Sequence, residues 1–264
     1  MSLRRASVRR LTERQGNLMT TQQSLDGIAI SLDQANDRAC SSEYYLLRYR
    51  WRVLMPRLRG PRILELGCAE GEMTKFLAKQ FPEVVAVDGS ALLLERARKD
   101  VHANNVVFQQ ALFEEFVPDG KFSSIVVACV LEHVQDPIAF LRRCKEWLAP
   151  KGRIYIMVPN AYALNRRVGK AMGMLKRLDE LHERDLRLGH QRVYSRQTLA
   201  ADIESAGLEA AHWDGILLKP LSDAQVQNWD PALLDAFFEV GKELPEWCTE
   251  IYVECQAPIV AKGR

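Results

Sequence analysis

The sequence predicts an α/β fold centred on a strand, a tight turn, a helix and a second strand. Residues 62–66 form a short apolar run, which is typical of a buried strand. Small residues follow closely, and residues 72–79 have a helical pattern. A second apolar run, residues 84–88, ends in an aspartate. This βαβ arrangement indicates a parallel sheet with helices packed against it.

The turn between the first strand and the helix has the features of a cofactor loop. Gly67, Ala69 and Gly71 have little or no side chain, so a ligand can lie almost on the backbone there. Cys68 stands among them. Asp88 ends the second strand roughly 20 positions after Gly67, where an acid reaches the two hydroxyls of a ribose. The pattern predicts a cofactor that contains adenosine.

The charges around this turn indicate which adenosine cofactor it is. The spacing is G-x-A-x-G, not the G-x-G-x-x-G of dinucleotide-binding loops. Glu65 precedes Gly67 by two residues, and Glu70 lies inside the turn. Carboxylates there would repel a pyrophosphate but suit a cationic amine and a sulfonium. S-adenosylmethionine (SAM) has both of these groups and no phosphate, so SAM is the predicted cofactor.

Later segments resemble a known family. Residues 126–134, VVACVLEHV, followed by Asp136 and Pro137, resemble the fourth strand of class I SAM-dependent methyltransferases, most closely the small-molecule branch with L-E-H-V. Residues 148–159 resemble that family's next segment, and the resemblance covers residues 40–160 best. It implies a Rossmann-like, seven-stranded, mostly parallel sheet with an antiparallel last strand and helices on both faces. SAM would bind at the carboxyl ends of the first strands.

The expected adenine site departs from the family pattern. Residues 106–110 are the predicted third strand, and many family members carry an acid just beyond it for the adenine amino group. Aligned on Glu114, this chain has Leu112 there. Leu112 and Phe113 would then pack on the ring, leaving its amino group to a backbone carbonyl or water. The predicted cofactor-binding residues are Glu65, Gly67, Cys68, Ala69, Gly71, Asp88, Gly89, Leu112, Phe113 and Cys129.

Composition limits the function classes. With 264 residues the chain can bury a sizeable core, and it lacks an apolar run long enough to span a membrane. A net charge of +2 gives no indication of a nucleic-acid partner, and residues 128–131 lack the Asn/Asp-Pro-Pro-aromatic sequence of DNA-adenine methyltransferases. The six cysteines show no metal spacing, which suits reduced thiols. We expect a cytoplasmic monomer or homodimer.

The chain divides into a tail and one domain. Residues 1–37 begin with an arginine-rich stretch and are predicted to be a largely disordered or irregular tail; a targeting peptide is the alternative. Residues 38–264 would form the methyltransferase domain, with a first helix starting near Ser42 in which Tyr45 or Arg48 either touches the cofactor or simply packs. The last elements are predicted to be a helix over residues 196–206, a strand within 208–218, a helix within 224–240 and a strand over 250–255.

Residues 161–196 are the least family-like part of the chain. Apolar residues recur at helical spacing from Ala163 to Leu175, which predicts an amphipathic helix. Nine Arg or Lys residues stand against four acids in this segment. It is either a helical lid whose basic face meets an anionic substrate, or a solvated face with an apolar stripe on the domain.

Two histidines are the candidate catalytic residues. Methyl transfer from a sulfonium needs alignment and exclusion of water, and it needs a base only if the acceptor holds its proton. His133 follows the fourth strand, and His190 sits where a lid could bring it over the methyl group. The alternative is that His133 only orders the turn after the strand and that His190 is a loop histidine bonded to the backbone. Some metal-dependent O-methyltransferases carry E-x-x-E-H at this strand end. Because Cys129 replaces the first Glu and hard divalent ions prefer oxygen, no metal is predicted.

The sequence therefore predicts a SAM-dependent methyltransferase that acts on a small molecule, with O-methylation ahead of N-methylation. The rival from another class is a catalytically silent domain that binds SAM or a partner. The intact cofactor loop and its acids count against it. Methylation of RNA or protein would need a basic groove or an added domain, for which only residues 161–196 are available.

Overall fold

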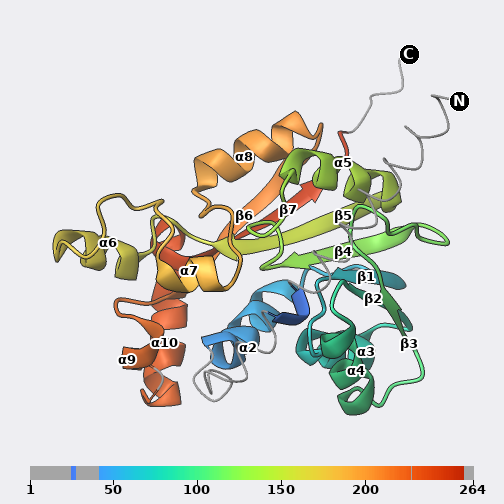
Figure 1. The fold of residues 1–264 in the computed structure, drawn as a ribbon, viewed down its shortest axis with the longest axis horizontal. Coiled ribbons are helices and arrows are strands. Elements are labelled where there is room, and N and C mark those ends of the chain that lie inside the picture. Colours follow the sequence, from blue (N-terminus) through green and yellow to red (C-terminus); the bar gives the residue numbers. More distant parts are fainter. Residues whose placement is uncertain (1–24, 28–41, 227, 259–264) are drawn as a thin grey trace, which may run out of the picture.

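The computed structural model describes residues 25–27, 42–226 and 228–258 (Figure 1). Its centre is a seven-stranded sheet in the order β3-β2-β1-β4-β5-β7-β6. The strands are β1 Arg62–Leu66, β2 Glu83–Asp88, β3 Val106–Gln110, β4 Phe122–Ala128, β5 Leu148–Pro159, β6 Glu209–Leu218 and β7 Cys248–Gln256. The first five are parallel, and β7 runs antiparallel to both neighbours, β5 and β6. The predicted fold class is confirmed.

Helices cover both faces of the sheet. They are α2 Ser42–Leu54, α3 Glu72–Gln80, α4 Ala91–Asp100, α5 Pro137–Trp147, α6 Leu164–Ala171, α7 Glu183–Arg187, α8 Arg196–Ser205, α9 Asp223–Val226, α10 Pro231–Gly241 and the short 3-10 helix η1 Pro245–Trp247. In Figure 1, α5 and α8 lie above the sheet, and α2, α3 and α4 lie below it. The segment with α6 and α7 extends beyond the carboxyl end of β5.

Alternating side chains of β1 supply the cores on the two faces. Leu64 and Leu66 belong to a buried cluster that includes Phe140 of α5, whereas Ile63 belongs to a second cluster with Leu77 of α3. A two-residue period is what a strand buried on both faces requires. Each of these side chains, fully buried, contributes about 1.5–3 kcal/mol. This packing on both faces fixes the position of the end of β1 in the sheet, where the cofactor loop begins.

The fourth strand ends before the LEHV sequence. β4 ends at Ala128, and Cys129 has a φ of 53°, a left-handed value that ends extended pairing. A turn follows, in which the His133 N–H donates to the Val130 carbonyl at 2.9 Å. The resembling residues 126–134 therefore comprise the end of the strand and the turn after it, and His133 follows the strand as predicted. Glu132 and His133 consequently lie in a turn beyond the strand end.

The amphipathic helix predicted over residues 163–175 was wrong in extent and in orientation. α6 ends at Ala171, before Gly173 with a φ of 76°. Met172 is 70% exposed, although the apolar pattern placed it inward. Arg166 is buried instead, because its guanidinium donates to the carbonyl of Leu178 at 2.7 Å. The alternation of apolar residues could not reveal this internal use of an arginine.

The N-terminal tail is only partly open to comparison. Residues 25–27 form a helical turn, and the rest of the tail prediction lies outside the described residues.

Among the helices that the structure describes, none has both the length and the apolarity needed to cross a bilayer. The predicted helix over 196–206 is confirmed: the Ser195 hydroxyl accepts the Thr198 N–H at 3.1 Å, and Gly207 follows with a φ of 71°.

Candidate cofactor and acceptor site

The loop after β1 adopts a conformation that favours small residues. Gly67, Ala69 and Gly71 have φ values of 74°, 46° and 82°, all in the left-handed region. The Gly67 N–H donates to the Val87 carbonyl at 2.8 Å. A Cβ atom on Gly67 would lie 2.4 Å from Cγ2 of Val130, which is closer than atoms can approach. The loop is therefore packed directly against the turn that follows β4.

Asp88 ties this loop to the start of α4. Its two carboxylate oxygens accept the N–H groups of Ala69 and Ser90, each at 2.9 Å. Burial raises the pKa of Asp88, while the N–H groups of Ser90, Ala69 and Gly89 oppose the rise. A carboxylate oxygen has two lone pairs, so each oxygen retains capacity for a hydroxyl group. This geometry suits the ribose role that the sequence predicts for Asp88.

Glu65, at the end of β1, is less charged than the sequence suggested. Glu65 is 4% exposed and accepts the Thr74 hydroxyl at 2.6 Å. Burial raises the pKa of Glu65 to about 8, against the opposing Thr74 hydrogen bond and with a further contribution from Asp88. Glu70 pairs with Arg96 at 2.8 Å. A bound cation would draw the proton off Glu65, so the charge complementarity forms on binding.

The predicted adenine corner has a wall that the sequence did not indicate. A Cβ atom on Gly89 would lie 2.6 Å from Cδ1 of Leu25 and 3.2 Å from Cδ2 of Leu112. Phe113 packs edge-on against Phe140, with 5.4 Å between ring centroids. Leu25 belongs to the stretch predicted to be a largely disordered or irregular tail, of which the structure describes only residues 25–27. Its apolar side chain reaches the corner only through the tertiary fold.

Next to Leu25, Asp26 reaches the beginning of α4. The Ser90 hydroxyl donates to Asp26 Oδ1 at 2.5 Å. The same hydroxyl accepts the Leu93 N–H at 3.2 Å and so caps the helix. An acidic side chain at a helix N-terminus is favourable, which accounts for the docking of residues 25–27 here.

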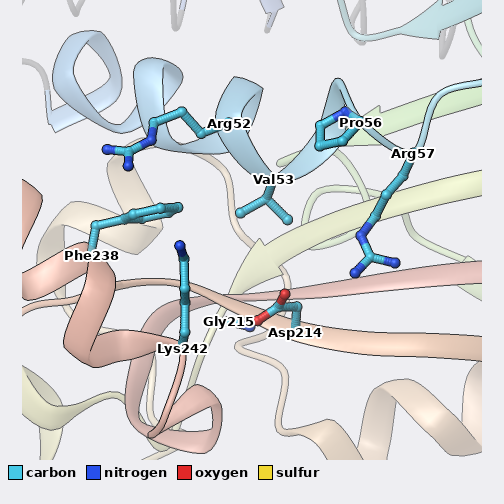
Figure 2. Close-up of a pocket in the computed structure, with 8 residues that line it drawn as sticks. All are labelled: Arg52, Val53, Pro56, Arg57, Asp214, Gly215, Phe238 and Lys242. Atoms are coloured by element: carbon cyan, nitrogen blue, oxygen red, sulfur yellow. Dashed lines mark hydrogen bonds between the residues drawn. The ribbon is translucent and has the colours of Figure 1, made fainter.

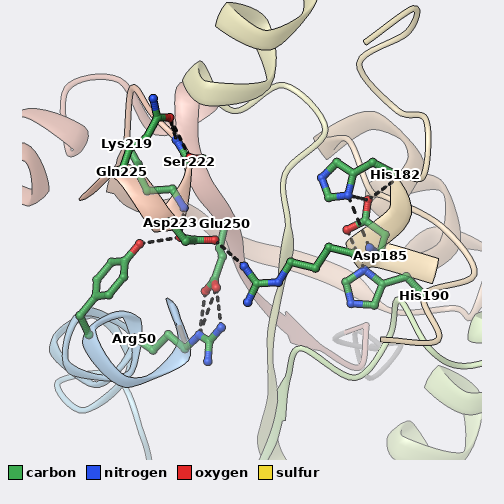
Figure 3. Close-up of polar contacts among 11 residues, drawn as sticks. Arg50, His182, Asp185, His190, Lys219, Ser222, Asp223, Gln225 and Glu250 are labelled. Carbon is green, nitrogen blue, oxygen red and sulfur yellow. Dashed lines mark hydrogen bonds and ion pairs between the residues drawn. The ribbon is translucent and has the colours of Figure 1, made fainter. Parts of the chain in front are cut away.

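Cys129 contacts a buried ion pair at the carboxyl end of the sheet. Arg50 of α2 donates to Glu250 of β7 at 2.6 and 2.9 Å (Figure 3), and its Nη2 also lies 3.0 Å from Cys129 Sγ. Arg50 is 8% exposed and Glu250 is 2% exposed. A bidentate pair of this kind holds its partners in fixed orientation. The sequence did not indicate Arg50 or Glu250, which are far apart along the chain.

Tyr45 takes part in a second polar cluster beside that pair. Its hydroxyl donates to Asp223 at 2.7 Å, and Arg184 of α7 pairs with the same carboxylate at 3.1 Å. Burial, reinforced by Asp223, raises the pKa of Tyr45. Arg48, by contrast, pairs with Asp235 at 2.8 Å and is more than half exposed. Of the two α2 residues considered from the sequence, Tyr45 therefore faces the polar cluster that includes α7, and Arg48 faces α10.

The two candidate histidines lie against each other. The rings of His133 and His190 meet edge to face with 4.7 Å between centroids. The Nδ1 atom of His190 lies 3.3 Å from Asp185 Oδ1 (Figure 3), and the Gln191 N–H donates to the Glu132 carbonyl at 2.8 Å. Burial, and then the neighbouring His190, lowers the pKa of His133 to about 4. Glu132, His133 and His190 offer ligand atoms within 4.8 Å of one another.

A cavity of about 200 Å³ lies elsewhere, between α2, β6 and α10 (Figure 2). Arg52 stands 4.2 Å from the Phe238 ring centroid and Lys242 stands 5.1 Å from it. Both cations pair with Glu239, at 2.8 and 2.5 Å. None of the predicted cofactor or catalytic residues lines this cavity. We assign it no part in the chemistry.

The fold and the cofactor loop define a class I SAM-dependent methyltransferase. The model of the methyltransferase domain family matches residues 40–212, which is more than half of the chain. The chain belongs to this family, it is a SAM-dependent methyltransferase, and its cofactor is S-adenosylmethionine.

Two relatives carry the name ubiquinone biosynthesis O-methyltransferase. The protein from Pasteurella multocida (strain Pm70) is 33% identical over 116 residues, which are 39% of this chain and 48% of the relative. The protein from Xanthomonas euvesicatoria pv. vesicatoria (strain 85-10) is 28% identical over 173 residues, 62% of this chain and 69% of the relative. The first of these matches thus spans about half of the relative's length. Together they support methylation of a small molecule.

Solved structures share the fold. A SAM-dependent methyltransferase from Mesorhizobium loti has a TM-score of 0.59 at 20% identity, over 78% of this chain and 97% of that one. The N-methyltransferase NodS from Bradyrhizobium japonicum WM9, in complex with S-adenosyl-L-homocysteine, has a TM-score of 0.54 at 15% identity, over 89% and 98% of the two chains. At these identities the likeness concerns the fold alone.

Proposed function

We propose that this methyltransferase transfers the methyl group of SAM to an oxygen atom of a small-molecule acceptor. The observation that carries the proposal is the paired histidines, His133 and His190, in contact with the turn that packs on the cofactor loop. Val130, which abuts Gly67, is only three residues before His133. A group that removes a proton therefore lies close to the methyl donor. The O-methyltransferase names of the two relatives agree with this proposal.

The proposed cofactor contacts follow from the loop geometry. Asp88 would accept the ribose hydroxyls, and Glu65 would face the positively charged methionine end. Gly67, Cys68, Ala69 and Gly71 would offer backbone to the cofactor. The adenine ring would pack among Gly89, Leu112 and Phe113, and Cys129 would lie on the side of the methyl group.

His190 is the better-placed base of the two histidines. Asp185 lies 3.3 Å from its Nδ1 atom and can hold the proton of the imidazole there, which leaves Nε2 to accept a proton from the substrate. With a pKa of about 4, His133 is a poor base near neutral pH. The acceptor O–H bond breaks toward His190, the oxygen attacks the methyl carbon, and the carbon–sulfur bond breaks. The products are a methyl ether, S-adenosylhomocysteine and a proton.

The segment from 161 to 196 would act as the lid that carries this base. Gly189 has a φ of 78°, and the Gln191 N–H donates to Glu132, so the segment bridges α7 and the turn after β4. Several of its cations already have partners: Arg177 pairs with Asp179 at 2.5 Å, and Arg184 pairs with Asp223. An anionic acceptor would have to compete with these carboxylates. The anionic character of the acceptor stays a prediction that rests on the charge count of the segment.

The test is turnover on a library of small hydroxylated and aminated acceptors, followed by mass spectrometry. His190→Ala should lower kcat by about 10²–10⁴-fold with little change in SAM affinity. His102→Ala is the matched control, because His102 is an exposed histidine in the loop after α4. Methylated amines as the sole products would replace the proposal with N-methylation. Tight SAM binding without any product would support a silent domain.

A further inference from the structure

Residues 25–27 dock on the rim of the cofactor site, although they precede the part of the chain that the family model matches. That match begins at residue 40, and the cofactor loop, Asp88 and the start of α4 all fall within it. Residues 25–27 contact Gly89 and Ser90, the two residues that directly follow Asp88. A segment outside the matched domain therefore meets the cofactor site next to the acid assigned to the ribose.

Leu25 completes an apolar wall beside Asp88. A Cβ atom on Gly89 would lie 2.6 Å from Leu25 Cδ1 and 3.2 Å from Leu112 Cδ2, so the two leucines meet over a residue that has no side chain. Both leucines are only partly buried. Apolar surface that is still open to water gains free energy when a flat apolar ring covers it. The wall therefore offers the packing surface that an adenine ring requires.

Asp26 fixes the neighbouring backbone through the cap of α4. Its Oδ1 atom accepts the Ser90 hydroxyl at 2.5 Å and the Leu92 N–H at 3.4 Å. The Ser90 N–H in turn donates to Asp88 Oδ1 at 2.9 Å, so one residue links the two carboxylates. Burial raises the pKa of Asp88, and the charge of Asp26 adds to the rise. Asp26 is therefore close enough to Asp88 to influence both its orientation and its charge.

We propose that Leu25 is a cofactor-binding residue that packs on the adenine ring of SAM, and that Asp26 is a positioning residue that acts through Ser90. The inference rests on the cofactor contacts proposed above, in which Asp88 accepts the ribose hydroxyls and the adenine ring packs against Gly89. Leu25 contacts the ring from the side of Gly89. The affinity for SAM therefore depends on a segment that precedes the matched domain.

Calorimetric titration of the full-length protein with SAM and with 5′-methylthioadenosine tests the role of Leu25. The second probe keeps the adenine and ribose of SAM but lacks the methionine amino and carboxyl groups. Leu25→Ala should raise the dissociation constants of both probes by the same factor, about 5–20-fold, because the lost contact is at the adenine end. Gly27→Ala is the matched control. Nothing lies within 4 Å of the Cβ position of Gly27, so this variant should bind both probes as the wild type does.

A pair of variants tests the role of Asp26. Asp26→Ala removes the acceptor for the Ser90 hydroxyl and should weaken SAM binding about 3–10-fold. Asp26→Asn keeps an oxygen that can accept the same hydrogen bond, so its affinity should stay within about twofold of the wild type. Equal losses in the two variants, or no loss in Asp26→Ala, would overturn the role through Ser90. Circular dichroism shows whether each variant is folded. If Leu25→Ala is not, amide hydrogen exchange of residues 25–27 in the wild type decides, because both probes should slow it.

Three outcomes would overturn the role of Leu25. Unchanged affinity for both probes in Leu25→Ala would remove the adenine contact, and tighter binding would mean that Leu25 occupies the place of the ring. A loss for SAM alone would put Leu25 at the methionine end. Asp88→Ala separates this inference from the cofactor contacts on which it rests. If Asp88→Ala weakens binding of both probes and Leu25→Ala does not, only the role of Leu25 fails; if neither variant changes the affinity, the proposed placement of the cofactor is wrong.

Discussion

Replacing Gly67 by alanine tests how the cofactor loop is built. Gly67 has a φ of 74°, and a Cβ atom there would lie 2.4 Å from Cγ2 of Val130. The substitution therefore imposes two costs, one from the backbone conformation and one from the clash. Gly173 provides the matched control, since its φ is 76° and nothing lies within 4 Å of its Cβ position. The comparison separates the two costs.

The magnitudes can be worked from this geometry. A left-handed conformation costs a residue with a Cβ atom about 1–2 kcal/mol, so Gly173→Ala should lower the free energy of unfolding by that amount. Forcing an extra carbon into a packed site costs about 1–3 kcal/mol more. Gly67→Ala should therefore lose about 2–5 kcal/mol in total. It should also weaken SAM binding, because relief of the clash must move the loop or the turn after β4.

Denaturant unfolding and titration calorimetry with SAM measure both effects. Adding Val130→Ala to Gly67→Ala should restore part of the loss, and the double-mutant cycle should give a coupling energy of about 0.5–3 kcal/mol. Equal costs for Gly67→Ala and Gly173→Ala, with unchanged SAM affinity in both, would refute the reasoning. The loop would then not depend on its contact with Val130.

Three further predictions concern charged groups. Asp88→Ala should weaken SAM binding by about 1.5–3 kcal/mol through loss of a charged hydrogen-bond acceptor; unchanged affinity by calorimetry in a folded variant would exclude the ribose role. Glu65 has a pKa of about 8 in the cofactor-free protein, so SAM binding near pH 7 should release a proton, and Glu65→Gln should abolish the release measured in buffers of different ionisation enthalpy. His133 has a pKa of about 4 when folded and 6.5 when unfolded, so the unfolded state binds more protons between these values. Its contribution to stability should be present above pH 6.5 and lost as the pH falls toward 4; denaturant unfolding of His133→Gln should show a flatter pH dependence, and identical slopes would argue against a buried neutral imidazole.

The sequence predicted the parts of the site that depend on local patterns. Closely spaced small residues and an acid at a strand end are local features, and the positive φ values at Gly67 and Gly71 bear out the predicted tight turn. The apolar run of β1 reflects burial on both faces of the sheet, so this strand could be predicted from the sequence. Helix capping by Ser195 was equally local, because the capping group and the N–H it accepts are close in sequence.

Contacts between segments that are distant along the chain could not be predicted from the sequence. Arg50 meets Glu250 only because α2 lies beside the amino end of β7, and no period or spacing encodes that pairing. The approach of His190 to Glu132 depends on the path of the loop after α7. The extent and orientation of α6 were predicted wrongly because Arg166 is buried and donates to backbone carbonyls. Hydrophobic periodicity does not detect an interaction of this kind. Leu25 reaches Gly89 from a stretch whose composition indicated only a tail.

The central claim is that the methyl group of SAM passes to an oxygen of a small molecule at the turn carrying Glu132 and His133. The most direct measurement is NMR of the product formed from SAM labelled with carbon-13 in its methyl group. Paired acceptors that differ only in a hydroxyl or an amino group would be supplied to the wild type and to His190→Ala. The account predicts a labelled methyl ether from the wild type and strongly reduced formation by the variant. A labelled N-methyl product alone, or equal rates for the two proteins, would contradict it.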